Sequence, residues 1–211
     1  NPELAKHTLY VNLSDFYFTE HTLVDLAAEF VAGGGQVLLV DQAYKYPNWS
    51  RELSQCYYRY PDLRIVFTAT AVMRVVEDNK DIGHIVHPYN LRGFSFREYL
   101  NVTLGLKLPV YSLEDILKNH VEIAQQVSRH IKPLQYFKDY LHHGFYPFFL
   151  EKRNFSENLL KTMNMMIEVD ILLIKQIEQK YLSKIKKLLY LLAVDGPAAP
   201  NVSQLATEIQ T

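Results

Sequence analysis

Residues 36–42 read QVLLVDQ, an apolar run that ends in an acid and an amide. A near-continuous apolar run of this length is typical of a parallel strand covered on both faces. The triplet Gly33-Gly34-Gly35 comes directly before it, and residues 22–32 have the apolar spacing of a helix. The triplet therefore ends a helix and leads into the strand, which places Asp41 at the carboxyl end of that strand.

Strand and helix signals alternate through the first hundred residues. Strand patterns lie at residues 8–13, 36–41 and 64–68, with a further candidate at 82–91 that Pro88 interrupts. Helix patterns separate them, the second at residues 48–58. Strands separated by helices predict an α/β fold with a parallel sheet. We expect Asp41 and Thr68 to lie at the same, carboxyl, edge of that sheet.

After residue 100 the strand signals stop. Helix patterns follow at residues 112–130, 134–143, 155–168, 181–194 and 202–209. The change near residues 101–112 is therefore the best candidate for a domain boundary. The aromatic run at residues 145–149 is too apolar to leave in water, so we expect it to be mostly buried in a monomer.

Composition excludes several classes of protein. The 211 residues carry 22 Lys and Arg against 23 Asp and Glu, so the net charge of -1 gives no sign of binding to nucleic acid. The single cysteine, Cys56, cannot form an internal disulfide. No signal peptide or membrane-spanning run is visible. We expect a cytoplasmic protein.

The acid at the end of the apolar run is the most informative chemical feature. P-loop ATPases hold magnesium with an acid delivered in this way, either directly or through water. The alternative is a buried strand that ends in a solvated aspartate. Taken alone, the pattern at residues 36–41 does not decide between the two.

Two longer motifs add context. Residues 41–53 read DQAYKYPNWSREL, and residues 91–100 read LRGFSFREYL. Together they resemble prokaryotic AAA-type (P-loop) ATPases, whose segments read DExHKYPNW and LxGLSFREYL. Residues 60–68 and 140–151 look like the sensor strand and part of the helical lid of that family. The resemblance implies a partial nucleotide-binding domain at 1–105, a helical lid at 112–175 and the start of a winged helix-turn-helix at 180–211.

The resemblance also implies roles for single residues. Asp41 would hold Mg²⁺ as the Walker B acid, and Thr68 would act as the sensor of the γ-phosphate. Thr70 and Arg92 would contact the nucleotide. Gln42 occupies the position of the glutamate that activates water, and an amide cannot accept a proton as a carboxylate does. We therefore expect hydrolysis to be impaired.

The phosphate-binding loop of the family is not found in this sequence. A GxxxxGK[ST] segment occurs nowhere among the 211 residues, and the triplet at 33–35 lacks the Lys-Ser/Thr pair. By resemblance, the loop and the first strand lie upstream, so we expect a truncated or partial chain, or a decayed one. ATP and Mg²⁺ are expected as cofactors only if the N-terminal region is present. Whether the chain is an enzyme stays open.

Two other functions compete with an ATPase fragment. One is a non-catalytic scaffold or interaction module on a decayed ATPase fold. The other is a DNA-associated regulator that uses the lysines at 180–187 and the helix at 202–209. The helix that would enter a DNA groove is missing, so nucleic acid is not expected to bind these residues. The expected partners are an unknown protein client and a second copy of the chain, with no membrane.

Overall fold

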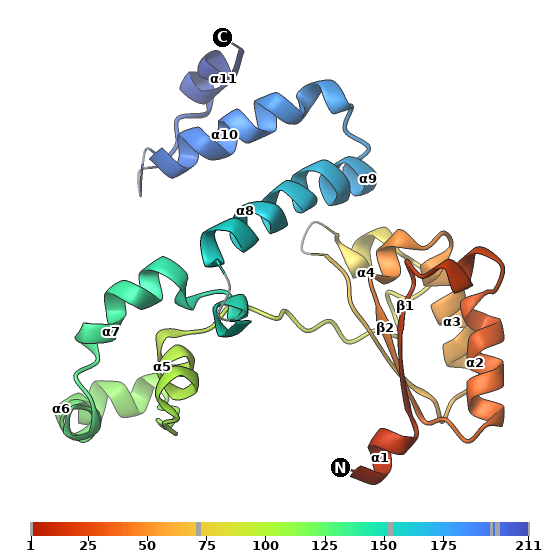
Figure 1. Ribbon diagram of the computed structural model, residues 1–211, viewed down its shortest axis with the longest axis horizontal. Coiled ribbons are helices and arrows are strands. Elements are labelled where there is room, and N and C mark those ends of the chain that lie inside the picture. The colour runs from red at the N-terminus through yellow and green to blue at the C-terminus, as the bar shows by residue number, and fades with distance from the viewer. Residues whose placement is uncertain (1, 71–72, 152–153, 195, 197–198, 211) are drawn as a thin grey trace. The chain divides into compact units, whose positions relative to one another are not determined.

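The computed structural model describes residues 2–70, 73–151, 154–194, 196 and 199–210 (Figure 1). Their contacts divide the chain into two compact units. The first holds residues 1–89 and 166–211, and the second holds residues 90–165. Within the described ranges, no helix combines the length and apolar character needed to cross a bilayer.

A three-stranded parallel sheet forms the centre of the first unit. The strands are β1 (Thr8–Asn12), β2 (Val37–Asp41) and β3 (Arg64–Phe67), in the order β1-β2-β3. Asn12 pairs with Asp41, and Val40 pairs with Phe67, so all three strands end at one edge. The predicted α/β class and parallel sheet are confirmed, and Asp41 and Thr68 emerge at the same carboxyl edge.

Helices cover one face of this sheet. Helices α2 (Leu23–Ala32) and α3 (Trp49–Arg59) lie on the same side of the strands (Figure 1). Their apolar residues join those of β2 in the core, which contains Leu23, Ala27, Leu38, Val40, Leu53 and Cys56. Thr22 caps α2 by a reciprocal pair of hydrogen bonds with Asp25, which fixes where the helix begins.

The opposite face of the sheet is largely bare. Tyr10, Leu39 and Val66 stand in one row across the three strands. Tyr10 is 61% exposed and Val66 is 57% exposed, whereas Leu39 is half-buried. The expectation that β2 is covered on both faces therefore holds only in part, since Leu39 on its second face is half-buried rather than buried.

The candidate strand at residues 82–91 is wrong. The amides of Ile85 and Val86 both donate to the carbonyl of Ile82, so the backbone turns on itself there. The side chain of Ile82 is nevertheless buried in the core. An apolar residue that anchors a turn gives the same sequence signal as one in a strand, and Pro88 is consistent with the absence of a ladder.

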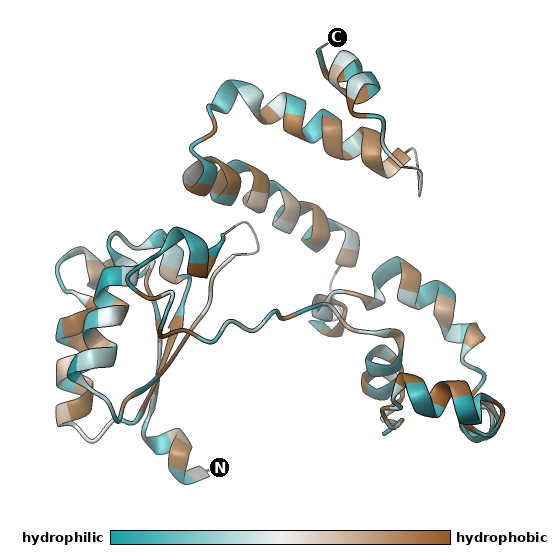
Figure 2. Ribbon diagram, turned by 180° about the vertical axis from the view of Figure 1, so that it is seen from behind, coloured by the Kyte–Doolittle hydropathy of each residue, from teal (hydrophilic) through white to brown (hydrophobic). Residues whose placement is uncertain are grey.

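Short elements complete the first unit. They are α1 (Pro2–Lys6), η1 (Phe16–Thr19), η2 (Ala43–Lys45), α4 (Val75–Asp78), η5 (Met166–Ile171), α9 (Leu172–Lys175) and η6 (Gln179–Tyr181). Helices α10 (Leu182–Val194) and α11 (Val202–Gln210) follow. Figure 2 shows apolar bands along α10, and several of its large apolar side chains remain exposed.

The second unit is helical in its described part. It contains α5 (Phe96–Leu104), α6 (Leu113–His130), α7 (Leu134–Asp139), η3 (Tyr140–Gly144), η4 (Pro147–Glu151) and α8 (Phe155–Met165). Ser112 caps α6 through a capping box with Asp115, which fixes where this helix begins. The described residues of 112–211 form no strand, which confirms the helical second half. The predicted division into a lid and a winged helix stays a prediction.

Gly93 and Gly144 allow the two halves of the second unit to pack closely. We call Gly93, Phe94, Gly144 and Phe145 together the glycine joint. The Phe94 amide donates to the Phe145 carbonyl at 2.8 Å. A Cβ on Gly93 would lie 2.6 Å from that same carbonyl oxygen. A Cβ on Gly144 would lie 2.8 Å from the ring of Tyr99. The motif at 91–100 therefore serves to pack against the motif at 140–151.

The expectation of a buried aromatic run at 145–149 is wrong for its first three residues. Phe145 is 48% exposed, Tyr146 is 42% exposed, and Pro147 is also exposed. Phe148 and Phe149 are half-buried, and Phe149 contacts the rings of Phe94 and Tyr99. Phe145 is held through its backbone carbonyl, which leaves much of its ring free of the packing.

Candidate functional site

Four residues form a hydrogen-bonded cluster at the carboxyl edge of the sheet, the strand-end network: Tyr10, Asp41, Gln42 and Thr68. Oδ1 of Asp41 accepts from Thr68 Oγ1 at 2.5 Å and from the backbone N–H of Gln42 at 3.0 Å. Oδ2 accepts from the Tyr10 hydroxyl at 2.8 Å. All three strands therefore contribute to holding one carboxylate.

The backbone of Gln42 is strained. Its φ of 53° and ψ of 38° lie in the left-handed region, which costs a non-glycine residue about 1–2 kcal/mol. The Gln42 amide also donates to Thr68 Oγ1 at 3.0 Å, so two acceptors hold it. The side-chain oxygen of Gln42 accepts from Ser14 Oγ at 3.5 Å. Strain of this kind is concentrated at functional sites in proteins, which supports a functional role for this turn.

The network stabilises Asp41 as an anion. The hydrogen bond from Thr68 is the largest influence that lowers the pKa of Asp41, and Tyr10, the Gln42 amide and the charge of Lys45 act in the same direction. The hydrogen bond to Asp41 in turn raises the pKa of Tyr10. At neutral pH the carboxyl edge of the sheet therefore carries the negative charge of Asp41, which accepts hydrogen bonds from the hydroxyl groups of Thr68 and Tyr10.

This arrangement fits part of a magnesium–nucleotide site. One carboxylate next to a threonine hydroxyl suits Mg²⁺ that is held through water and completed by phosphate oxygens. No group of three or more His, Cys, Asp or Glu side chains gathers among the described residues. The sequence contains no glycine-rich loop with a Lys-Ser/Thr pair to cradle phosphates. The sequence therefore supplies a carboxylate suited to Mg²⁺, but it supplies no loop suited to holding the phosphates.

Thr70 makes a different contact from the other candidates. Its hydroxyl donates to Asp170 Oδ2 at 3.4 Å, and the hydroxyl of Tyr44 donates to Asp170 Oδ1 at 3.0 Å. Burial, followed by the hydrogen bond to Asp170, raises the pKa of Tyr44 to about 12. Sequence reasoning missed Asp170, which is only 4% exposed. The signal that could have found it is a single acid set among apolar residues in MIEVDI, residues 166–171.

Arg92 lies in the second compact unit, where it is exposed. Its predicted contact with a nucleotide stays a prediction. Cys56 is buried in the core of the first unit, and burial raises the pKa of its thiol to about 11. A thiol in that state is inert, so Cys56 has a structural role.

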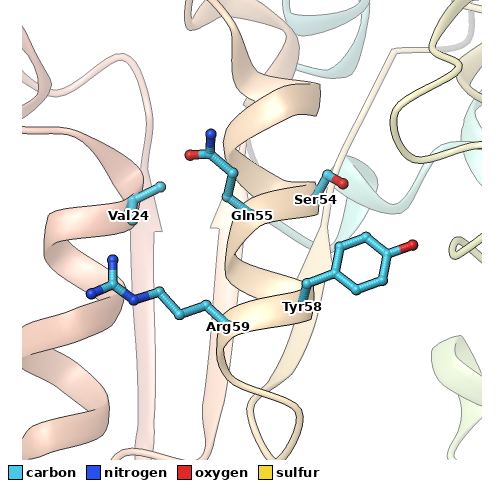
Figure 3. A pocket seen from close by; sticks show the side chains of 5 residues that line it. All are labelled: Val24, Ser54, Gln55, Tyr58 and Arg59. Carbon is cyan, nitrogen blue, oxygen red and sulfur yellow. The ribbon is translucent and has the colours of Figure 1, made fainter.

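A surface hollow of about 590 Å³ lies on the helical side of the first unit. Figure 3 shows its lining residues, Val24 from α2 and Ser54, Gln55, Tyr58 and Arg59 from α3. None of these residues belongs to the strand-end network. The hollow is open and brings no group of catalytic side chains together, so the strand-end network is the better candidate site.

Comparison with known proteins gives one positive result. Residues 2–100 match a family described as the AAA domain. No curated protein and no solved structure gives a significant match to the chain. The matched range contains all three strands and the strand-end network, and it extends through the motif at 91–100. Residues 2–100, somewhat less than half of the chain, are therefore similar to the AAA domain of P-loop ATPase-like proteins.

Proposed function

We propose that this chain is part of an AAA-type ATPase, or a divergent member of that class, in which ATP binding and hydrolysis are impaired. The observation that carries the proposal is the strand-end network. In it the Thr68 hydroxyl contacts the Asp41 carboxylate at 2.5 Å, and the backbone N–H of Gln42 donates to both groups. A solvated aspartate at a strand end would not need donors from three strands.

Each member of the network has a proposed role. Asp41 would hold Mg²⁺ through water, and the Thr68 hydroxyl would respond to the γ-phosphate of a bound nucleotide. Gln42 would sit beside the attacking water but could not take its proton, since an amide is not a base. The chemical step would therefore be slow even when a nucleotide is bound. Thr70 and Arg92 would supply further nucleotide contacts.

The sheet has an open edge and a bare face, which further strands and helices of the same domain would cover. The outer edge of β3 has no neighbouring strand in the described structure. Unprotected apolar edges accept further strands readily. We propose that a strand carrying a phosphate-binding loop pairs with β3 and that its helix covers the bare face at Tyr10, Leu39 and Val66.

The helical parts belong to the same proposal. Residues 112–175 would act as a lid over the nucleotide, and residues 180–211 would open a winged helix-turn-helix used for contacts with a protein client or a second copy of the chain. The buried, unpaired thiol of Cys56 is compatible with a reducing cytoplasm.

A second function, a non-catalytic interaction module, is favoured by α6. Leu113, Ile116 and Leu117 lie on this helix ahead of its non-helical residue Asn119, and all three are exposed. Their spacing of three and four residues puts them along one side of the helix. Such a stripe suits contact with a partner protein, and it needs no nucleotide.

Nucleotide binding separates the two functions. The 211-residue chain should bind ATP weakly or not at all by calorimetry. An extended chain that includes a GxxxxGK[ST] loop should bind Mg-ATP, and Gln42→Glu in it should raise kcat with little change in nucleotide affinity. If the extended chain with Glu at 42 binds no nucleotide, the ATPase proposal fails and the interaction module stands.

A further inference from the structure

Among the described residues, Asp170 is the acidic side chain that is buried, and two hydroxyl groups donate hydrogen bonds to it. It lies on η5, 126 residues from its donor Tyr44 and 100 residues from its donor Thr70. Among the described residues, no Lys, Arg or His forms a salt bridge with it. A buried carboxylate is costly unless it is hydrogen-bonded, so these two contacts account for its presence there.

Both donors are placed in the same way relative to the strand-end network. Tyr44 comes two residues after Gln42, and Thr70 comes two residues after Thr68. One carboxylate therefore bridges the turn that follows β2 and the loop that follows β3. Asp41 also acts on Tyr44, because its negative charge contributes to the raised pKa of that hydroxyl.

The backbone that carries Asp170 is unusual. Met166–Ile171 forms a π-helical turn, and Ile167 in it is also buried. Turns of this type are rare and are frequent at functional sites. The wide turn and the buried acid are two separate features of the same six residues.

We propose that Asp170 is a positioning residue that ties the helical segment 166–211 to the two loops that carry Gln42 and Thr68, so that a displacement of these helices changes the strand-end network. The contact has two states, joined and released. In the joined state, Tyr44 and Thr70 are fixed by one carboxylate. In the released state, both loops lose that restraint together. This inference deepens the proposed function, since it names what would control the same site.

Hydrogen exchange of the 211-residue chain, without nucleotide, tests the proposal. Asp170→Asn should speed exchange of the amides at 42–46 and at 166–171 together, each by about tenfold or more, because hydrogen bonds to a buried charge are lost. Glu168→Gln is the matched control. It removes the same charge from the same turn, but Glu168 is exposed and pairs with Lys186 on the surface. It should leave both segments unchanged.

A double-mutant comparison adds a measurement that a purely local defect at position 170 would not change. Tyr44→Phe should speed exchange at 166–171, and adding Asp170→Asn to it should have less effect there than Asp170→Asn alone. Asp170→Asn should also lower the pKa of Tyr44, followed by the ¹³Cζ shift of labelled tyrosine. If Asp170→Asn does not fold, Tyr44→Phe and Thr70→Val carry the exchange test.

The proposal is overturned if Asp170→Asn behaves like Glu168→Gln, or if it affects 166–171 and leaves 42–46 unchanged. Because no nucleotide is present, this outcome is independent of whether the chain, or an extended form of it, binds ATP.

Discussion

The strand-end network and the glycine joint both lie in motifs that are specific at the level of sequence, but they are built in opposite ways. In the network, polar groups from three strands surround one carboxylate that lies partly open to solvent. In the glycine joint, two backbones and several aromatic rings approach too closely for a side chain at Gly93 or Gly144. The first arrangement can act on a ligand, and the second holds helices together.

This difference bears on how motifs are interpreted. LRGFSFREYL at 91–100 and DQAYKYPNW at 41–49 are segments of similar length that both resemble family signatures. The structure gives the first a packing role, since its glycine and Phe94 meet the backbone of Phe145. Only the second places a strained residue beside an anionic side chain. A specific motif therefore does not by itself indicate chemistry.

The largest effect should come from the glycine joint. Gly93→Ala should destabilise the chain by about 2–4 kcal/mol, because the new Cβ would meet a backbone oxygen that cannot move away cheaply. Denaturant unfolding measures it. Gly33→Ala is the control, since its Cβ would sit 3.5 Å from the nearest atom, an ordinary contact. Equal stability of the two variants would show that the close approach at Gly93 is not a constraint.

Asp41→Asn should have a smaller effect, and that effect should depend on pH. The pKa of Asp41 is lowered in the folded chain. The stabilisation it contributes is therefore fully present above its unfolded pKa, about 3.9, and is lost as the pH falls through the lower folded value. Urea unfolding at pH 7 should show the wild type to be the more stable by about 1 kcal/mol, and the gap should close below pH 4. A gap that widens in acid would contradict the network.

Thr68 tests one bond of the network. Thr68→Val should cost about 1 kcal/mol and should raise the pKa of Asp41, because the hydroxyl is the main group that lowers it. Thr68→Ser keeps the hydroxyl and should leave the pKa of Asp41 low. Carboxyl ¹³C titration of the two variants measures this difference. If both variants titrate alike, the 2.5 Å contact does not stabilise the anion.

The smallest effect concerns backbone strain. Gln42→Gly should stabilise the chain by up to about 1 kcal/mol, because glycine adopts a φ of 53° without the cost that glutamine incurs. Thermal unfolding measures it. Ser14→Ala is a control for loss of the side-chain contact with Gln42 alone. A clear loss of stability in Gln42→Gly would mean that the side chain matters more than the strain.

The sequence predicts the sheet well and the long-range contacts poorly. The strand at 37–41 and the cap at Ser112 follow from local patterns, which a short window of residues contains. The candidate strand at 82–91 failed because Ile82 anchors a turn in the core and imitates a strand residue. The contact between Asp170 and Tyr44 spans 126 positions, and no local pattern reports such a pairing.

The same limit applies to the candidate site. The positions of Asp41, Gln42 and Thr68 at one edge follow from parallel strands of similar length. The part played by Tyr10 depends on strand order, which placed β1 next to β2 and its hydroxyl within 2.8 Å of Asp41. Strand order is a property of the whole sheet, so a sequence pattern in one strand could not supply it.

The central proposal is that Asp41, Gln42 and Thr68 form the strand end of an AAA-type site in a sequence whose 211 residues contain no phosphate-binding loop. Steady-state phosphate release, with nucleotide calorimetry, tests it on the wild-type chain, Gln42→Glu and Asp41→Ala. The account predicts no measurable turnover in any of the three, and no rescue by Gln42→Glu, because a base is of no use where phosphates are not bound. Robust turnover by the wild-type chain that Asp41→Ala abolishes would contradict it.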